Sequence, residues 1–211
     1  MKNNKKNLFA VILCFALLLC SCNNQINHEN IRGTISEMSG SAKIYYTNNF
    51  LGIGCEFDDN HKFFSDEDIA KMNNTKVAPK IVYEMENDAT ICDMMVQNKT
   101  NGGVALVTIQ KIPPSKESLS IQEYCDQELE QSKPQFTAMG YTVKSSKQTT
   151  VSCMGEERPA LSLSIVAEGN VTIETLLIFI KCHDHYMASI TVMSMNGTSN
   201  NDLLKAFHYL Q

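Results

Sequence analysis

The chain has 211 residues, of which 43% are hydrophobic and none is tryptophan, and its formal net charge is −5. An acidic chain without a cluster of lysines and arginines argues against a nucleic-acid partner and against membrane binding through charge. The length is sufficient to bury a substantial core in one domain.

The first 21 residues predict a secretory signal peptide. Three lysines lie within the first six residues, and the segment Leu8–Leu19 that follows carries no charge. This apolar segment is too short for a helix that crosses a bilayer, which needs about 20 residues. A positive start, a short apolar centre and a small residue at the exit are typical of a signal peptide, so we expect residues 1–21 to be removed.

The end of this segment resembles a bacterial lipobox. The sequence LCSC, from Leu19 to Cys22, places an aliphatic residue at −3, a small residue at −1 and a cysteine directly after the cut. The resemblance implies lipid attachment at Cys22, and two or three acyl chains at about 0.8 kcal/mol per buried methylene hold a protein stably on a bilayer. We therefore expect a lipid-anchored protein at the cell membrane, on its extracytoplasmic face. The alternative is an ordinary signal peptide followed by an incidental cysteine.

The predicted mature chain begins with a polar stretch. Removal of residues 1–21 takes away three lysines and no acidic residue, so the mature net charge is −8. Residues 22–42 are rich in Asn, Gln, Ser, Glu and Gly and show no period, which predicts a flexible tether behind the lipid. Residues 43–211 are expected to form a single globular domain.

The first half of this domain predicts strands and a short helix. Lys43–Phe57 contains two strand-like pieces. A helix over Asp66–Asn73 follows, with Ser65 as its N-cap and an acidic first turn. The apolar runs within Ala89–Ile112 meet at Asn101-Gly102, a dipeptide that tolerates the positive φ of a tight hairpin.

The second half predicts one long helix and then a meander of strands. Ser120 and Glu123 form a capping box, and an apolar stripe runs on to Met139 before Gly140, which suits the position after a helix. Pro134 should bend this helix or end it early. The remaining expected elements are strands at Tyr141–Ser146, Gln148–Met154, Ala160–Ala167, Val171–Cys182 and Tyr186–Met195, and a helix capped by Ser199 and Asp202 that carries Leu203, Leu204 and Phe207.

These elements predict an α+β fold, in which helices pack on an antiparallel β-sheet. Several stretches resemble a lipoprotein branch of the PsbP-like superfamily: YYTNNFLGIGCEFDDNHKFFSDEDIAKMN from Tyr45 to Asn73, EYCDQELEQ with the later MGY, and HYMASITVMS with LLKAFHYL. The resemblance covers nearly the whole domain and implies an α/β/α sandwich around an antiparallel sheet. Members of this superfamily in photosynthesis and nuclear transport bind other proteins and are not enzymes, so the resemblance implies a binding role.

The cysteines beyond Cys22 predict buried free thiols. An odd number in an exported protein leaves at least one thiol unpaired, and no C-x-x-C spacing indicates a redox motif or a zinc site. We expect them to pack as small apolar residues, and the sequence leaves any disulfide pairing open. The five are Cys55, Cys92, Cys125, Cys153 and Cys182.

The turn from Cys182 to His185 is the one local cluster with metal-ligand chemistry. His183, His185 and the aspartate between them could meet zinc or copper. Adjacent residues seldom complete a metal site unaided, so we expect a polar hairpin tip and predict neither a metal nor a cofactor. Met187, Met193 and Met195 alternate on one strand face, where core packing explains them without copper.

No motif in the sequence indicates catalysis, since it has no nucleophile elbow, H-E-x-x-H helix, P-loop or dinucleotide fingerprint. A pair assembled in space from a cysteine and His61 or His208 stays open. The aromatic residues within Tyr45–Phe50 favour either a protein contact or, as we expect, half-buried strand positions.

The leading hypothesis is therefore a bacterial cell-envelope lipoprotein whose domain binds an envelope or extracellular protein, or a small ligand, without catalysis. The alternative is a small surface metal-dependent hydrolase or metal-binding protein that uses the turn at His183 and His185. A structural or stress-related envelope factor is a third possibility. Fold alone does not separate these functions.

Overall fold

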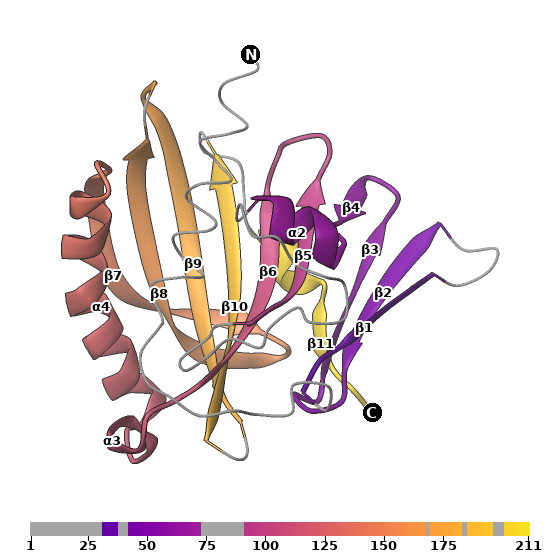
Figure 1. Cartoon of the computed structure of the whole chain (residues 1–211), viewed down its shortest axis with the longest axis horizontal. Helices are drawn as coiled ribbons and strands as arrows, with labels where there is room; N and C mark the ends of the chain where they lie inside the picture. The colour runs from indigo at the N-terminus through magenta and orange to yellow at the C-terminus, as the bar shows by residue number, and fades with distance from the viewer. Residues whose placement is uncertain (1–30, 38–41, 73–90, 168, 183–184, 196–200) are drawn as a thin grey trace.

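Two antiparallel sheets and the helices packed on them make up the part of the chain that the structure describes (Figure 1). The structure is a computed structural model and describes residues 31–37, 42–72, 91–167, 169–182, 185–195 and 201–211. Within these ranges, no helix has the length and apolar character needed to cross a membrane.

The larger sheet has seven strands in the order β4-β5-β6-β10-β9-β8-β7, and every neighbouring pair is antiparallel. Short turns join β8 to β9 and β9 to β10, so the predicted meander is confirmed. The seven strands are β4 (His61–Phe63), β5 (Ile91–Asn98), β6 (Val104–Lys111), β7 (Thr142–Cys153), β8 (Glu156–Ala167), β9 (Val171–Lys181) and β10 (Tyr186–Met195).

The smaller sheet has four strands in the order β1-β2-β3-β11. Its first strand corrects the predicted domain boundary, because Thr34–Glu37 pairs with β2 and lies inside the segment that we expected to be tether. The strand was not predicted because residues 22–42 are polar and because none of its four residues is buried. The strands are β1 (Thr34–Glu37), β2 (Lys43–Asn48), β3 (Ile53–Asp58) and β11 (Phe207–Tyr209).

Helices α2 (Asp66–Met72) and α4 (Ile121–Ala138) cover one face of the larger sheet, and the short α3 (Pro114–Glu117) precedes α4. The core on this face joins Ile69 of α2 and Phe136 of α4 to alternate residues of the strands. The predicted alternation in β8 is confirmed, since Leu161, Leu163, Ile165 and Ala167 all belong to this core.

The second face of the larger sheet packs on the smaller sheet and on α5 (Asn201–Lys205). Phe57 and Tyr46 of the smaller sheet meet Val107 and Ile190 in this second core. The α+β prediction is thus confirmed, and the single sheet expected between two helix layers is joined by a second sheet (Figure 1).

The long helix α4 begins and ends as the sequence predicts. The Ser120 hydroxyl accepts from the backbone N–H of Glu123, whose carboxylate accepts from the N–H of Ser120 at 2.8 Å. Gly140 follows the helix with a φ of +86°, and the N–H of Tyr141 donates to the carbonyl of Phe136. Pro134 was expected to bend this helix or to end it early, and it does not end it, because four further residues remain helical.

Other predicted boundaries shift by a few residues. The β5–β6 hairpin turns at Asn101-Gly102 as expected, and Gly102 has a φ of +76°. The two strands predicted between Tyr141 and Met154 are one continuous strand, β7, which is bent by a bulge between Val143 and Ser145. Phe207, expected on the final helix, lies instead on β11.

Candidate functional site

Most residues of the predicted lipid attachment site and of the predicted histidine turn lie outside the described residues. Cys22, the predicted lipid attachment site, belongs to the segment 1–30 and has no described placement. Of the predicted histidine turn, His183 and Asp184 also lie outside the described ranges. The lipid anchor therefore stays a prediction, and so does the choice between a metal site and a polar tip.

His185 is described, and its ring contacts the carboxylate of a residue in helix α3. Its Nδ1 lies 2.7 Å from a carboxylate oxygen of Glu117 at the end of α3, and its backbone φ is +68°. The ammonium of the nearby Lys181 donates to the carbonyls of Glu117 and Leu119. These contacts fasten α3 to the β9–β10 turn, and among the described residues no three His, Cys, Asp or Glu side chains are grouped as a metal site would require.

All five cysteines of the domain are free thiols, as predicted. Four are buried and Cys182 is half-buried. Burial raises the pKa of Cys125, Cys153 and Cys182 to about 11 and that of Cys92 to about 12, and it raises the pKa of Cys55 further. A protonated, buried thiol is a poor nucleophile, so these groups act as small core residues.

The two histidines considered as partners for a thiol have other contacts. The Nδ1 of His61 lies 2.7 Å from Asp58, and its Nε2 lies 3.1 Å from the side-chain nitrogen of Asn98. His208 is exposed, and its Nδ1 lies 3.4 Å from the carbonyl oxygen of Ala206.

The methionine and aromatic positions confirm their packing interpretations. Met187 and Met193 are buried in the helix-side core, and Met195 packs against it. Tyr46 is fully buried, and the ring of Phe50 packs edge-on against Tyr186 with 5.4 Å between centroids. The aromatic run of β2 is therefore structural.

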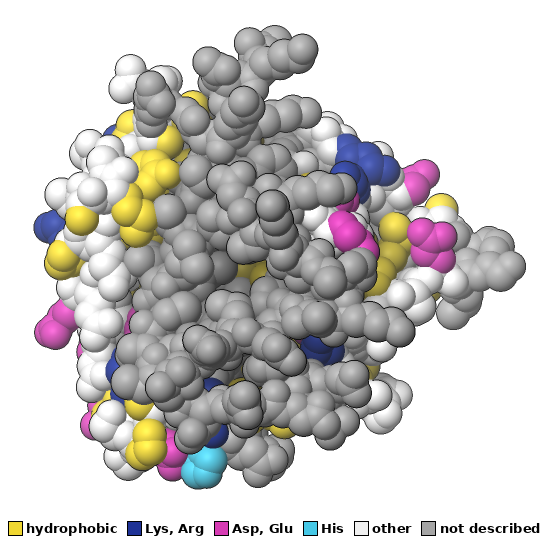
Figure 2. All heavy atoms as spheres, viewed as in Figure 1, with side chains coloured by type: hydrophobic (Ala, Val, Ile, Leu, Met, Phe, Trp, Pro, Cys, Tyr) yellow, Lys and Arg dark blue, Asp and Glu magenta, His cyan; other side chains and the backbone are white. Residues whose placement is uncertain are grey.

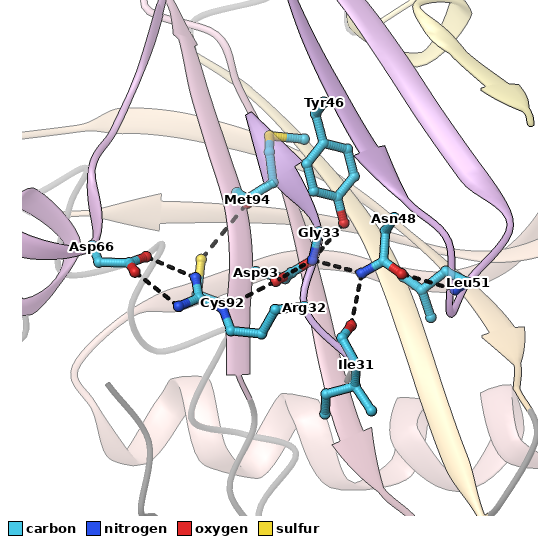
Figure 3. A network of polar contacts seen from close by, with 10 residues as sticks. All are labelled: Ile31, Arg32, Gly33, Tyr46, Asn48, Leu51, Asp66, Cys92, Asp93 and Met94. Atoms are coloured by element: carbon cyan, nitrogen blue, oxygen red, sulfur yellow. Dashed lines mark hydrogen bonds and ion pairs between the residues drawn. The ribbon is translucent and has the colours of Figure 1, made fainter. Parts of the chain in front are cut away.

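The strongest polar cluster surrounds Asp93, which the bulge between Cys92 and Met94 sets within β5 (Figure 3). One carboxylate oxygen of Asp93 accepts from the hydroxyl of Tyr46 at 2.6 Å and from the amide of Asn48 at 2.7 Å. The backbone N–H of Gly33 donates to the same oxygen at 2.8 Å. The Asp93 side chain is fully buried, so these donors replace the water that a buried carboxylate would otherwise need.

Arg32 connects this carboxylate to the helix side of the molecule. Its Nε lies 3.3 Å from Asp93, and its two terminal nitrogens bind the two oxygens of Asp66 at 2.8 Å each. The hydrogen bond to Asp66 raises the pKa of Arg32, while burial and the charge of Asp93 raise the pKa of Tyr46. The contacts of the arrangement fasten the segment Ile31–Gly33 to β2, β5 and α2.

Sequence analysis missed this cluster, although one signal was present. Asp93 interrupts the apolar run ICDMMV, and a charged residue inside a buried strand needs partners. The partners lie 45 to 61 residues away, and their identity could not be read from the sequence because Arg32 stands in the stretch that its composition marks as tether.

A second feature that the sequence did not predict is an open groove between α4 and β7. It encloses about 1000 Å³ and lies along the C-terminal half of the helix and the start of the strand. Figure 2 shows hydrophobic side chains gathered on the side of the molecule where the upper half of α4 lies. The groove is lined by Leu129, Glu130, Lys133, Pro134, Thr137 and Ala138 of α4 and by Val143, Lys144, Ser145 and Ser146 of β7.

The groove lies beside an open sheet edge. β7 is the last strand of the larger sheet, and β8 is its one neighbour among the described strands. The outer edge of such a strand offers backbone N–H and C=O groups to another chain. A helix and an edge strand that flank a groove are the parts used by domains that bind extended peptides.

Comparison with known proteins finds a similar fold among solved structures and no similar sequence. No protein-family model matches the chain, and no curated protein matches its sequence. The solution structure of cyanobacterial PsbP (CyanoP) from Synechocystis sp. PCC 6803 is similar at a TM-score of 0.46 and 12% identity, covering 82% of this chain and 98% of that one. At this TM-score the likeness carries no argument about function, so the fold description rests on the strand order given above.

Proposed function

We propose that the protein is an extracytoplasmic, lipid-anchored binding module that captures an extended segment of another protein in the α4–β7 groove. The observation that carries the proposal is the position of this groove beside the open edge of β7. The lipobox at Leu19–Cys22 supports the location, and it makes Cys22 the anchor. The module is proposed to act without catalysis.

The geometry favours an extended segment over a compact small ligand. A segment that pairs with β7 places alternate side chains on the two faces of the sheet, and those on the helix side enter the groove. Backbone pairing with β7 supplies affinity, and the groove supplies selectivity. The bulge at Val143 and Ser145 turns the strand at this point, which is a common device beside binding sites.

The lining of the groove defines the preferred segment. Lys133 and Glu130 carry opposite charges, and the ammonium of Lys144 donates to the hydroxyl of Thr172 on β9. The apolar members of the lining, Leu129, Ala138 and Val143, therefore favour a segment that presents small apolar side chains on the helix side.

The test uses a displayed library of ten-residue peptides against the purified protein, followed by hydrogen exchange of the bound complex. Selected peptides should slow amide exchange in residues 142–153, while the amides of β1, an edge strand of the smaller sheet, stay unchanged. Thr137→Arg fills the groove from an exposed position and should weaken binding at least tenfold. Gln131→Arg, on the same helix and outside the groove, is the matched control and should bind normally.

Two results would contradict the proposal. One is a library that yields no binder above background. The other is a set of binders whose affinity is the same in both arginine variants and whose binding leaves the exchange of β7 unchanged, because such peptides bind elsewhere.

A further inference from the structure

Ile31, the first described residue, lies at one end of the larger sheet, which is called the entry end below. Ile31 packs with Ile91, Ile109 and Tyr186, which lie at the ends of β5, β6 and β10. The β2–β3 turn lies at the same end, since Phe50 contacts the Tyr186 ring and Leu51 packs against this cluster. The β9–β10 turn precedes Tyr186, so it belongs to this entry end too.

We propose that the protein is held on the bilayer with the entry end facing the lipid and the α4–β7 groove facing away. The proposal rests on the lipid anchor at Cys22 from the proposed function and adds an orientation and a distance. Its partner is the lipid surface itself. Three observations carry it: where the chain is fastened, how little chain precedes that point, and how far the groove lies from it.

Residues 31–33 already bind the rest of the fold, ahead of β2, which begins at Lys43. The carbonyl of Ile31 accepts from the Asn48 amide at 2.8 Å, and Gly33 donates to Asp93 (Figure 3). A side chain at position 33 has no room, because its Cβ would lie 2.4 Å from the Tyr46 ring and 2.8 Å from the carbonyl oxygen of Thr47. With the bidentate contact of Arg32 to Asp66, these contacts form a latch of Ile31, Arg32 and Gly33 that fastens the chain from residue 31 onward.

The remaining tether is short. Nine peptide steps separate Cys22 from Ile31, and a fully extended chain covers at most about 3.3 to 3.6 Å per step. The entry end therefore cannot lie more than about 30 Å from the lipidated residue. A tether that ran to Lys43, as the composition predicts, would reach about 70 Å and would leave the orientation free.

The groove lies near the opposite end of the sheet. Thr142 pairs with Val166 beside the β8–β9 turn, whereas the β9–β10 turn lies at the entry end. The strand β9 connects these two turns with eleven residues, which span about 35 Å at the rise of an antiparallel strand. An anchor at the entry end thus keeps the start of β7 away from the headgroups.

The experiment measures energy transfer from the lipidated full-length protein, reconstituted in phosphatidylethanolamine and phosphatidylglycerol vesicles, to an acceptor on the lipid headgroups. The donor dye is attached at Asn49→Cys, at the entry end, or at Thr142→Cys, beside the groove; both positions are exposed. Labelling at pH 7 favours the introduced thiol, because it is exposed and has an ordinary pKa, whereas four native thiols are buried and burial raises the pKa of all five. Transfer from position 49 should exceed transfer from position 142 at least twofold.

Two insertions of twelve Gly and Ser residues test the latch. Placed between Glu29 and Asn30, the insertion lengthens the free tether and should remove the difference between the two dye positions. Placed between Gly40 and Ser41, after β1, it should leave the difference intact, because the chain is already fastened upstream.

The experiment distinguishes a wrong orientation from a wrong anchor, because the two give different results. Equal transfer from the two positions in a protein whose mass shows the lipid on Cys22 would overturn the orientation alone, as would equal effects of the two insertions. A purified membrane form that carries no lipid on Cys22 would overturn the anchor on which this inference rests.

Discussion

Asp93 shows at the scale of one residue how a buried charge stabilises the join between the two sheets. Its carboxylate receives hydrogen bonds from Tyr46 and Asn48 of the smaller sheet and from the chain at Gly33. Removal of the carboxylate would leave these donors buried and without their acceptor, and an unpaired buried polar group costs more than its hydrogen bond contributed.

We therefore expect Asp93→Ala to lower the free energy of unfolding by about 3 kcal/mol or more. Urea denaturation followed by circular dichroism measures the loss. Asp59→Ala, at an exposed position of the β3–β4 turn, is the matched control and should change stability by less than about 0.5 kcal/mol. A loss below about 1 kcal/mol for Asp93→Ala would show that water replaces the carboxylate, contrary to its complete burial.

The thiols predict a second effect at the same scale, on the pH dependence of stability. Burial raises the pKa of Cys125, Cys153 and Cys182 from the ordinary value of 9.0 to about 11. Between these values the unfolded chain has lost its thiol protons and the folded chain keeps them. The free energy of unfolding should be insensitive to these thiols below pH 8 and should fall as the pH rises from about 9 toward 11.

Urea denaturation at pH 8, 9 and 10 checks this dependence. The triple variant Cys125→Ala, Cys153→Ala and Cys182→Ala should lose less stability over this interval than the native sequence. An identical decline in both proteins would mean that other groups, such as the buried tyrosines, cause the whole effect.

At the scale of elements, α4 carries a residue that its own secondary structure disfavours. Pro134 has no backbone N–H to donate to the carbonyl of Glu130, and a proline inside a helix costs up to about 3 kcal/mol relative to alanine. The helix persists because its capping box fixes the start and because Tyr124, Cys125 and Phe136 bury its inner face. Tertiary packing thus overrides the local preference.

Pro134→Ala should consequently raise the midpoint of urea denaturation, by an amount equivalent to about 1 to 3 kcal/mol. Gln131→Ala, on the exposed side of the same helix, serves as the reference and should stay within about 0.5 kcal/mol of the native protein. Unchanged or lower stability of Pro134→Ala would indicate that the proline ring contributes packing to the groove that exceeds its backbone cost.

Some elements could be predicted from local sequence patterns and others could not. The caps of α2 and α4, the Asn101-Gly102 hairpin and the alternation of Leu161 to Ala167 were predictable, because each depends on residues a few positions apart. β1 was not, since it buries no side chain and is held by Arg32 and Gly33 through partners more than 30 residues away. The division of the strands into two sheets follows from such distant pairings too.

At the scale of the whole molecule, the fold separates two roles along the length of β9. The end where the chain enters is fastened by the latch of Ile31, Arg32 and Gly33, and the groove lies toward the other end beside the β8–β9 turn. This arrangement suits a protein that holds an anchor at one end and presents a strand edge at the other (Figure 1). The lipid that the sequence predicts at Cys22 would provide the anchor.

The mass of the N-terminal peptide from the membrane fraction provides the most direct test of this anchor. A lipid-anchored protein should yield a peptide that begins at Cys22 and carries a diacylglyceryl group, and Cys22→Ser should move the protein out of the membrane fraction. A peptide that begins elsewhere and carries no lipid, together with a Cys22→Ser variant that stays in the membrane fraction, would contradict the account.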